Sequence, residues 1–127
     1  MSKNEEYIMK ILLKENIYFE REKSFQDLRN GKYRFDFYIP NLHGARCVIE
    51  VDGEQHFYKV KCFQKTKTDF LKQQEHDRRK NSYCLANNIL LYRIPYWEIK
   101  NIFTFNDILN EKFKVKNKWH NDNIRRN

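Results

Sequence analysis

The chain has 127 residues, of which 40% are hydrophobic and 16% aromatic; this excludes an intrinsically disordered protein and suffices for one domain with its own core. It has no run of about 18 apolar residues, so we expect no membrane-spanning helix, and its N-terminus lacks the apolar centre of a secretory signal. The 25 lysines and arginines exceed the 17 acids, and the net charge of +8 favours nucleic acid as a partner, although a basic protein without one is the alternative.

Cysteine usage indicates a reducing compartment. The three cysteines, Cys47, Cys62 and Cys84, are scattered, and no C-x-x-C pair is present. This argues against a structural zinc site and against a disulfide framework. We therefore expect free thiols and an intracellular protein.

The first predicted element is an amphipathic helix over residues 3–15, with Ser2 or Asn4 as its N-cap. Three aliphatic residues share one face of this helix: Ile8, Ile11 and Leu12. Glu5 lies on the flank of that face. It either complements the helix dipole or reaches inward beside the core.

The centre of the chain is a predicted β-hairpin. A strand over residues 17–22 and an irregular connection over 23–33 lead into it. Its own two strands, over 34–39 and 46–51, alternate apolar and polar residues and are joined by a turn over 40–44 that contains proline, asparagine and glycine.

Each strand of this hairpin carries a carboxylate among its apolar residues. Asp36 lies in the first strand, Glu50 in the second, and Asp52 directly after it. Buried carboxylates need a partner, and adjacent ones repel unless a cation lies between them or one holds a proton. Because Mg²⁺ prefers carboxylate oxygens, the three acids predict a divalent-metal site. The alternative is an exposed hairpin edge whose acids face water.

A basic segment over residues 59–67 follows, and Phe57, Tyr58 and Phe63 are interleaved with its lysines. Such a segment can contact phosphates and stack on bases, whereas a solvated loop is the alternative. The residues that we expect to bind nucleic acid are Lys59, Lys61, Lys65, Lys67, Arg78 and Arg79.

A second helix is expected over residues 68–87. Phe70, Asp77 and Cys84 are spaced by seven, so they form one stripe and Asp77 falls on the side that packs. Lys80 is near enough to pair with Asp77. A buried Asp–Lys pair without any chemistry is the alternative to a functional role.

The last predicted strand covers residues 89–94, the most continuous apolar run, and should be central in the sheet and buried on both faces. Short helices are expected between residues 97 and 115. Residues 116–127 are basic and polar and predict a weakly ordered tail that contacts nucleic acid, which leaves residues 1–115 as a single domain.

Four segments in this order resemble the PD-(D/E)XK nuclease superfamily: R-F-D-F-Y-I-P, I-E-V-D-G-E-Q-H-F, H-D-R-R-K-N-S-Y-C and I-L-L-Y-R-I-P-Y. Within it they are similar to the branch of very-short-patch mismatch repair endonucleases and phage-type homing endonucleases with an E-D-x-H-D pattern. The resemblance spans Glu5 to about Glu98. It implies an α/β, restriction-endonuclease-like core with a central mixed β-sheet flanked by helices.

The resemblance also implies roles for single residues. Asp36 matches the acid that is central to metal binding, and Glu50 and Asp52 fall at the E-x-K positions. Asp52 replaces the lysine, so a lysine base at that point is excluded. His56 matches the histidine that the branch carries after D-G. The implied catalytic residues are Glu5, Asp36, Glu50, Asp52, His56, Asp77 and Lys80, of which Asp36, Glu50 and Asp52 would hold the metal.

The sequence thus predicts a metal-dependent DNA endonuclease, nicking or double-strand cutting, that uses Mg²⁺, with Mn²⁺ as an alternative. His56 would orient or deprotonate the attacking water, and Glu5 or Asp77 would fix its tautomer. A homodimer or a subunit of a larger assembly, cytoplasmic in a bacterial or phage-infected cell, is compatible with this hypothesis. The alternative function is a non-catalytic nucleic-acid-binding module on a nuclease-like scaffold, and RNA or branched substrates remain open.

Overall fold

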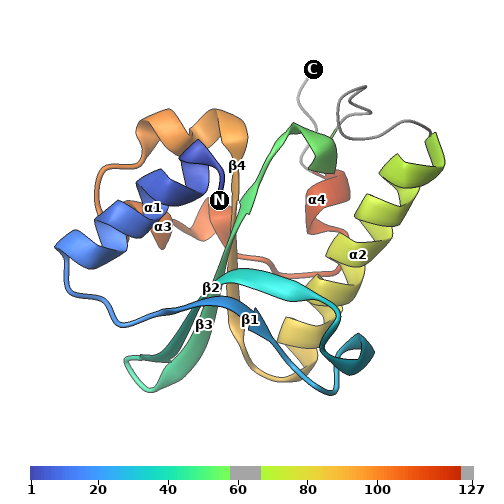
Figure 1. The fold of residues 1–127 in the computed structure, drawn as a ribbon, viewed down its shortest axis with the longest axis horizontal. Coiled ribbons are helices and arrows are strands. Elements are labelled where there is room, and N and C mark those ends of the chain that lie inside the picture. Colours follow the sequence, from blue (N-terminus) through green and yellow to red (C-terminus); the bar gives the residue numbers. More distant parts are fainter. Residues whose placement is uncertain (58–66, 124–127) are drawn as a thin grey trace.

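Residues 1–57 and 67–123, the part described by the computed structural model, fold around one mixed sheet (Figure 1). Its strands, in order across the sheet, are β1 (Glu20–Ser24), β2 (Arg34–Leu42), β3 (Ala45–Asp52) and β4 (Leu90–Pro95). Strand β2 is antiparallel to both of its neighbours, β1 and β3, whereas β4 is parallel to β3. The predicted α/β class with a mixed sheet flanked by helices is confirmed.

Two long helices cover opposite sides of the sheet (Figure 1). Helix α1 (Lys3–Lys14) begins at Ser2, the predicted N-cap, and packs its three aliphatic residues in a cluster with Ile49. Helix α2 (Lys67–Ala86) covers the other face, where Cys84 packs with Val48. Neighbouring residues of a strand point to opposite faces, so both sides of β3 are buried.

The hairpin turn lies later in the chain than predicted. Strand β2 continues through Pro40 to Leu42, and the turn is made by His43 and Gly44, whose φ angles are 52° and 91°. The Asn41 side chain accepts a hydrogen bond of 2.7 Å from the Gly44 N–H. The expectation that the proline opens the turn was wrong, because the β2–β3 pairing is irregular between Ile39 and Leu42 and accommodates a residue without an N–H.

Strand β4 is buried on both faces as predicted, but it ends the sheet rather than occupying its centre. Its outer edge is covered by the chain that returns after β4. The Val115 N–H donates a hydrogen bond of 2.8 Å to the Leu91 carbonyl, and Lys114 forms an isolated antiparallel β-bridge with Tyr92. An apolar strand can therefore lie at the edge of the sheet without exposing its backbone.

The chain after β4 forms short helical elements, among them α3 (Phe105–Ile108) and α4 (His120–Asn123), as Figure 1 shows. Helix α4 packs on α2, with Arg78 paired to Asp122 and Asn121 buried. The expectation of a weakly ordered tail was wrong for residues 116–123, while 124–127 lie outside the described residues. In the described ranges no helix has the length and apolar character needed to cross a membrane.

Candidate active site

The strands β2 and β3 separate where their two carboxylates lie. The ladder between them runs as far as the Phe37–Ile49 pair. Beyond it, the Asp36 N–H donates a hydrogen bond of 2.7 Å to Glu50 Oε1, and the Val51 N–H donates one of 2.8 Å to Asp36 Oδ2. Side chains therefore replace backbone carbonyls as acceptors, and each carboxylate is held by the neighbouring strand.

An irregularity of β2 accounts for this separation. Phe35 and Tyr38 are three residues apart yet pack in the same cluster, so the period of two is broken around Asp36. On the facing strand, Glu22 adopts a φ of 54°, and it is skipped in the β1–β2 pairing. The register is the same on either side of Glu22, so no residue is inserted, and the irregular backbone coincides with the opening of the sheet at the two acids.

These acids line a cleft of about 540 Å³, the candidate cleft. Of the seven predicted catalytic residues, five line it: Glu5, Asp36, Glu50, His56 and Lys80. Asp52 and Asp77 lie behind it, at 1% exposure each. The structure thus brings the predicted residues together in two layers, one open to the cleft and one closed.

The surroundings of Asp36 in the open layer disfavour its ionised form. Burial, with repulsion from Glu50 as the next cause, raises the pKa of Asp36 to about 8. The protein as described thus carries a proton on this carboxyl near neutral pH. The sequence had posed the choice between a cation and a held proton for these acids, and without a cation the proton is the outcome.

Lys80 forms its ion pair with Glu50 and not with Asp77, so the predicted Asp77–Lys80 pair was wrong. Its Nζ lies 3.1 Å from Glu50 Oε2 and also donates to the Arg34 carbonyl. Burial lowers the pKa of Lys80, but the neighbouring Glu50 outweighs it and leaves the pKa raised. Lys80 is therefore a fixed cation beside the carboxylates.

His56 joins the two layers. Its Nδ1 lies 2.8 Å from Asp77 Oδ2 and 3.6 Å from Asp52 Oδ1, so Asp77 is the acid that orients the ring. Burial lowers the pKa of His56, but the charges of Asp52 and Asp77 override burial and raise it to about 9. With the ring charged at neutral pH, His56 donates hydrogen bonds and does not accept a proton in this state.

Arg93 is the centre of the closed layer, and sequence reasoning missed it. Its Nη1 lies 2.8 Å from Asp52 Oδ1, and its Nε donates a hydrogen bond of 2.7 Å to Asn81 Oδ1. Its Nη2 lies 3.6 Å from Asp77 Oδ1. Burial raises the pKa of Asp52, but Arg93 and then His56 override it and leave the pKa lowered.

Asn121 of α4 completes the closed layer and was also missed. Its amide nitrogen donates hydrogen bonds of 2.9 Å to Asp52 Oδ2 and 3.4 Å to Asp77 Oδ2. The C-terminal segment thus supplies a donor to both acids around His56. No sequence pattern signals this contact, because 69 residues separate Asn121 from Asp52.

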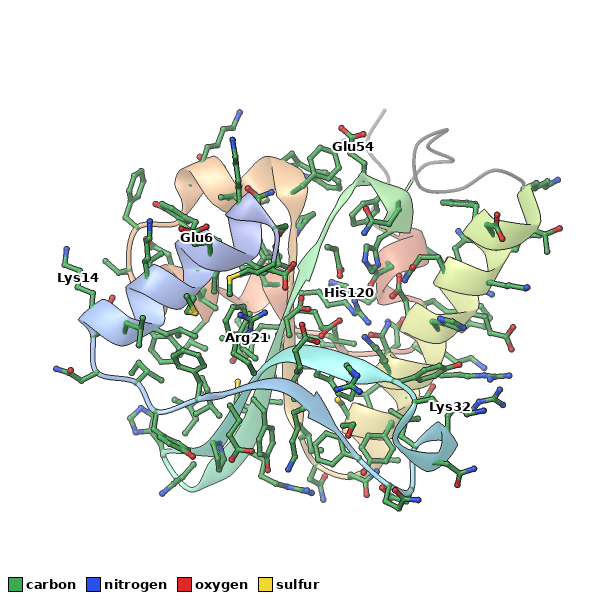
Figure 2. The ribbon with its side chains drawn as sticks, viewed as in Figure 1. Glu6, Lys14, Arg21, Lys32, Glu54 and His120 are labelled. Carbon is green, nitrogen blue, oxygen red and sulfur yellow. The ribbon has the colours of Figure 1, made fainter. Side chains whose placement is uncertain are left out.

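Glu5 performs both functions that the sequence had offered for it. Its carboxylate accepts from the Ser2 N–H in a capping box, and it also lines the candidate cleft. Glu5 Oε1 lies 3.2 Å from Arg21 Nη2, and Arg21 Nε donates 2.9 Å to the Asp36 carbonyl. Figure 2 shows Arg21 between α1 and the strands. Arg21 therefore links the first helix to the backbone at Asp36.

The predicted nucleic-acid-binding residues have mixed positions. Lys59, Lys61 and Lys65 lie outside the described residues, whereas Lys67 is exposed at the start of α2. Arg78 is paired with Asp122, and Arg79 with Glu75. These last two positions are therefore committed partly to contacts within the protein.

Another set of cations forms the rim of the candidate cleft. Arg29, Lys32 and Arg34 line it and are exposed, and Figure 2 shows Lys32 extending outward. In residues 1–57 and 67–123, none of the three side chains takes part in an ion pair or a hydrogen bond. In the sequence, these cations are visible as a high density of basic residues between 29 and 34. Most of this segment was interpreted only as a connecting loop.

Asp36 and Glu50 are the residues of the open layer that could hold a divalent cation. Asp36 and Glu50 offer carboxylate oxygens from adjacent strands, and Val51 lines the same cleft. Mg²⁺ is usually held by one or two carboxylates and completes its shell with water and phosphate. Within the described ranges, no group of three His, Cys, Asp or Glu side chains is arranged to hold a metal. Asp52, predicted as a ligand, is bonded to Arg93 and Asn121.

Comparison with known proteins assigns no family. No protein-family model matches the chain, and no solved structure matches it. A curated relative, "Uncharacterized protein 307L" of Invertebrate iridescent virus 6, is 34% identical over 79 residues, which is 61% of this chain. The chain spans 38% of that relative's length, and the relative's name states no activity.

Proposed function

We propose that the protein is a Mg²⁺-dependent nuclease that hydrolyses phosphodiester bonds in DNA. The observation that carries the proposal is the meeting of Asp36 and Glu50 where β2 and β3 separate, in a cleft rimmed by cations. The order helix, three antiparallel strands, helix and parallel strand supports a restriction-endonuclease-like core. DNA as the substrate rests on the resemblance of the sequence motifs and on the net charge of +8.

Asp36 and Glu50 would hold the cation, and the Val51 carbonyl is the adjacent backbone candidate. Bound there, Mg²⁺ supplies a Lewis acid for the phosphoryl oxygen. The Asp36 carboxyl has to lose its proton for this binding, so the pKa of about 8 makes cation affinity rise with pH. Glu50 Oε2 lies 3.1 Å from Lys80 Nζ, so this cation is already beside the site.

Cationic side chains provide the rest of the chemistry. His56, charged and oriented by Asp77, would donate a hydrogen bond to a phosphate oxygen or to the attacking water. Arg29, Lys32 and Arg34 at the rim would bind flanking phosphates. Asp52 and Arg93 lie behind the cleft and would act indirectly, by fixing the position and the charge of the His56 imidazole.

One observation favours the second candidate, a nucleic-acid-binding module without catalysis. Lys80 already places a positive charge 3.1 Å from Glu50, which is how a protein neutralises such a site without a metal. Binding of DNA with no measurable binding of Mg²⁺ or Mn²⁺ in calorimetry would support the module.

The test compares Asp36→Asn with the unchanged protein on supercoiled, linear, mismatched and branched DNA and on RNA, with Mg²⁺ or EDTA. We expect cleavage to fall by at least about 10²-fold while DNA affinity is retained. Asparagine resembles the protonated carboxyl that Asp36 already carries, so the variant should fold normally. Glu6→Gln on the outer side of α1 is the matched control. Cleavage by Asp36→Asn at the unchanged rate would refute the proposal.

A further inference from the structure

A second hollow lies along the outer side of α2 and is not used by the proposed chemistry. This hollow, the α2 groove, has a volume of about 830 Å³ and is lined by α2, the turn before residue 30, and the segment that leads into α4. Leu71 and Trp119 contribute its most exposed apolar surface, at 49% and 45% exposure. The side of α2 that faces the sheet carries Asp77, Asn81 and Cys84, whereas its outward side is partly apolar and partly basic.

Trp119 is partly exposed, and two cations lie over its rings. The guanidinium carbon of Arg78 and the Nζ of Lys118 each lie 4.7 Å from a ring centroid of Trp119. Arg78 is fixed in place by two hydrogen bonds to Asp122, of 2.9 and 3.1 Å. An exposed indole flanked by fixed positive charge is the arrangement on which unpaired nucleobases stack, with their phosphates beside the cations.

The charge of the α2 groove favours an anionic occupant. Four basic residues line it, Arg29, Arg78, Arg79 and Lys118, against two lining acids, Asp27 and Glu75; with Asp122, the partner of Arg78, counted as well, the charge is +1. Both acids already have partners within the protein. Asp27 accepts from the Tyr83 hydroxyl at 2.6 Å, and Glu75 pairs with Arg79 at 2.7 Å. The surplus positive charge therefore faces the space of the groove.

The α2 groove adjoins the candidate cleft. Arg29 lines both hollows. Tyr33, on the cleft side, accepts a hydrogen bond of 3.2 Å from Arg79 Nη1, on the groove side. The exposed Arg29 side chain and this Tyr33–Arg79 contact separate the two spaces. A strand that leaves the cleft past Arg29 therefore enters the groove directly.

We propose that the α2 groove binds the single-stranded flank of a DNA substrate, with a base stacked on Trp119 and phosphates on Arg29 and Lys118. The inference rests on the proposed function for the identity of the ligand. A duplex keeps its bases stacked internally, so only an unpaired flank can use the indole. The substrate class that follows is DNA in which a duplex continues into a single strand.

The test measures binding by fluorescence anisotropy with the uncleaving Asp36→Asn protein, using one duplex with and without a single-stranded tail. We expect the tail to tighten binding about tenfold, the effect of one stacked base. Trp119→Ala should abolish this gain and leave duplex affinity unchanged. Tyr18→Ala, which removes an aromatic side chain that is 71% exposed in a different hollow, should retain it.

Two further measurements separate the outcomes. Lys118→Gln should lower the salt slope of tailed-DNA binding by about one, and in a Trp97→Phe background the tail should quench the remaining tryptophan fluorescence. Equal affinity for tailed and blunt duplex would overturn the inference. This is the result expected if the groove instead binds a helix of a partner protein. That result leaves the nuclease proposal intact, whereas absence of cleavage with a persistent tail effect refutes only the nuclease.

Discussion

Asp36 and Asp52, one from each layer of acids in the site, have pKa values shifted in opposite directions. Asp36 and Glu50 face the open cleft, and burial and mutual repulsion raise the pKa of Asp36 to about 8. Asp52 and Asp77 are more deeply buried, yet Arg93 and His56 stand against them, and the pKa of Asp52 is lowered. Burial alone therefore does not decide the charge state of an acid here. The supply of internal cations does.

The difference in charge balance indicates a different role for each layer. The closed layer has two acids and two cations, which balance, so it needs nothing from outside and can hold His56 in one orientation. In the open layer, Glu5 pairs with Arg21, whereas Asp36 and Glu50 share Lys80 as their closest cation. Arg93 lies 4.0 Å from Glu50 but is already paired with Asp52, and the remaining deficit of positive charge is filled by a proton on Asp36. A site that lacks one positive charge is a site that an external cation can complete.

The largest expected effect comes from removing the cation of the closed layer. Arg93→Met should lower the free energy of unfolding by about 3–5 kcal/mol, because it leaves buried acids without their partner. Urea unfolding measures it. The matched control is Arg79→Met, whose ion pair with Glu75 is exposed and should contribute little to stability. Equal losses in the two variants would show that the closed layer is not held together by charge.

The two acids themselves give a sharper comparison. Asp52→Asn should destabilise the protein by about 2–3 kcal/mol, because Arg93 loses its closest counter-charge. Asp36→Asn should raise stability at pH 7, because the folded carboxyl is already neutral, whereas in the unfolded protein it loses its proton and asparagine cannot. If Asp36→Asn is the more destabilising change, the assignment of the proton to Asp36 is wrong.

The open layer was accessible to sequence reasoning, and the closed layer only in part. Acids in the middle of alternating strands are visible in any sequence, and pairing two such strands places them together. Arg93 carried a comparable signal, since an arginine inside the run I-L-L-Y-R-I requires a buried anion, but the sequence interpretation paired Asp77 with Lys80 and assigned Asp52 to the metal. The pattern was used only to predict a strand.

Other parts of the site depend on packing that no local pattern encodes. Helical spacing shows that Lys80 is one turn from Asp77, but only the crossing of α2 over β3 brings its amine to Glu50. Asn121 lies in a polar stretch whose composition is typical of a disordered tail. It becomes ordered because Asp52 and Asp77 need donors and Asn81 bonds the Lys118 carbonyl.

The pH dependence of stability follows from the same comparison. The pKa of Asp36 is raised from 3.8 to about 8, and that of His56 from 6.5 to about 9. Both groups bind protons more tightly when folded, so each contribution is complete below the unfolded pKa and is lost as pH rises through the folded one. Without metal, the free energy of unfolding should fall between pH 6.5 and 8.

Mg²⁺ and Asp36→Asn separate the two contributions. Asp36→Asn should flatten the decline below pH 8 and leave the part due to His56 up to pH 9. Saturating Mg²⁺ should stabilise the unchanged protein more at pH 8 than at pH 6.5, because the cation competes with the proton. Denaturant unfolding at several pH values, with and without Mg²⁺, measures both. A stability that rises from pH 6.5 to 8 without metal would contradict the assigned shifts.

Among variants of the closed layer, the smallest expected loss of stability concerns Asn121, which touches this layer from the C-terminal segment. Asn121→Ala removes two donors from the acids around His56 and should lower stability by about 1–2 kcal/mol. Asn123→Ala, on the exposed end of the same helix, is the control. If Asn121 only stabilised the fold, activity per folded molecule would not change. A loss of about 10-fold or more in cleavage rate, measured where the variant is fully folded, would instead show that it positions His56, because partners behind a site commonly act at that scale.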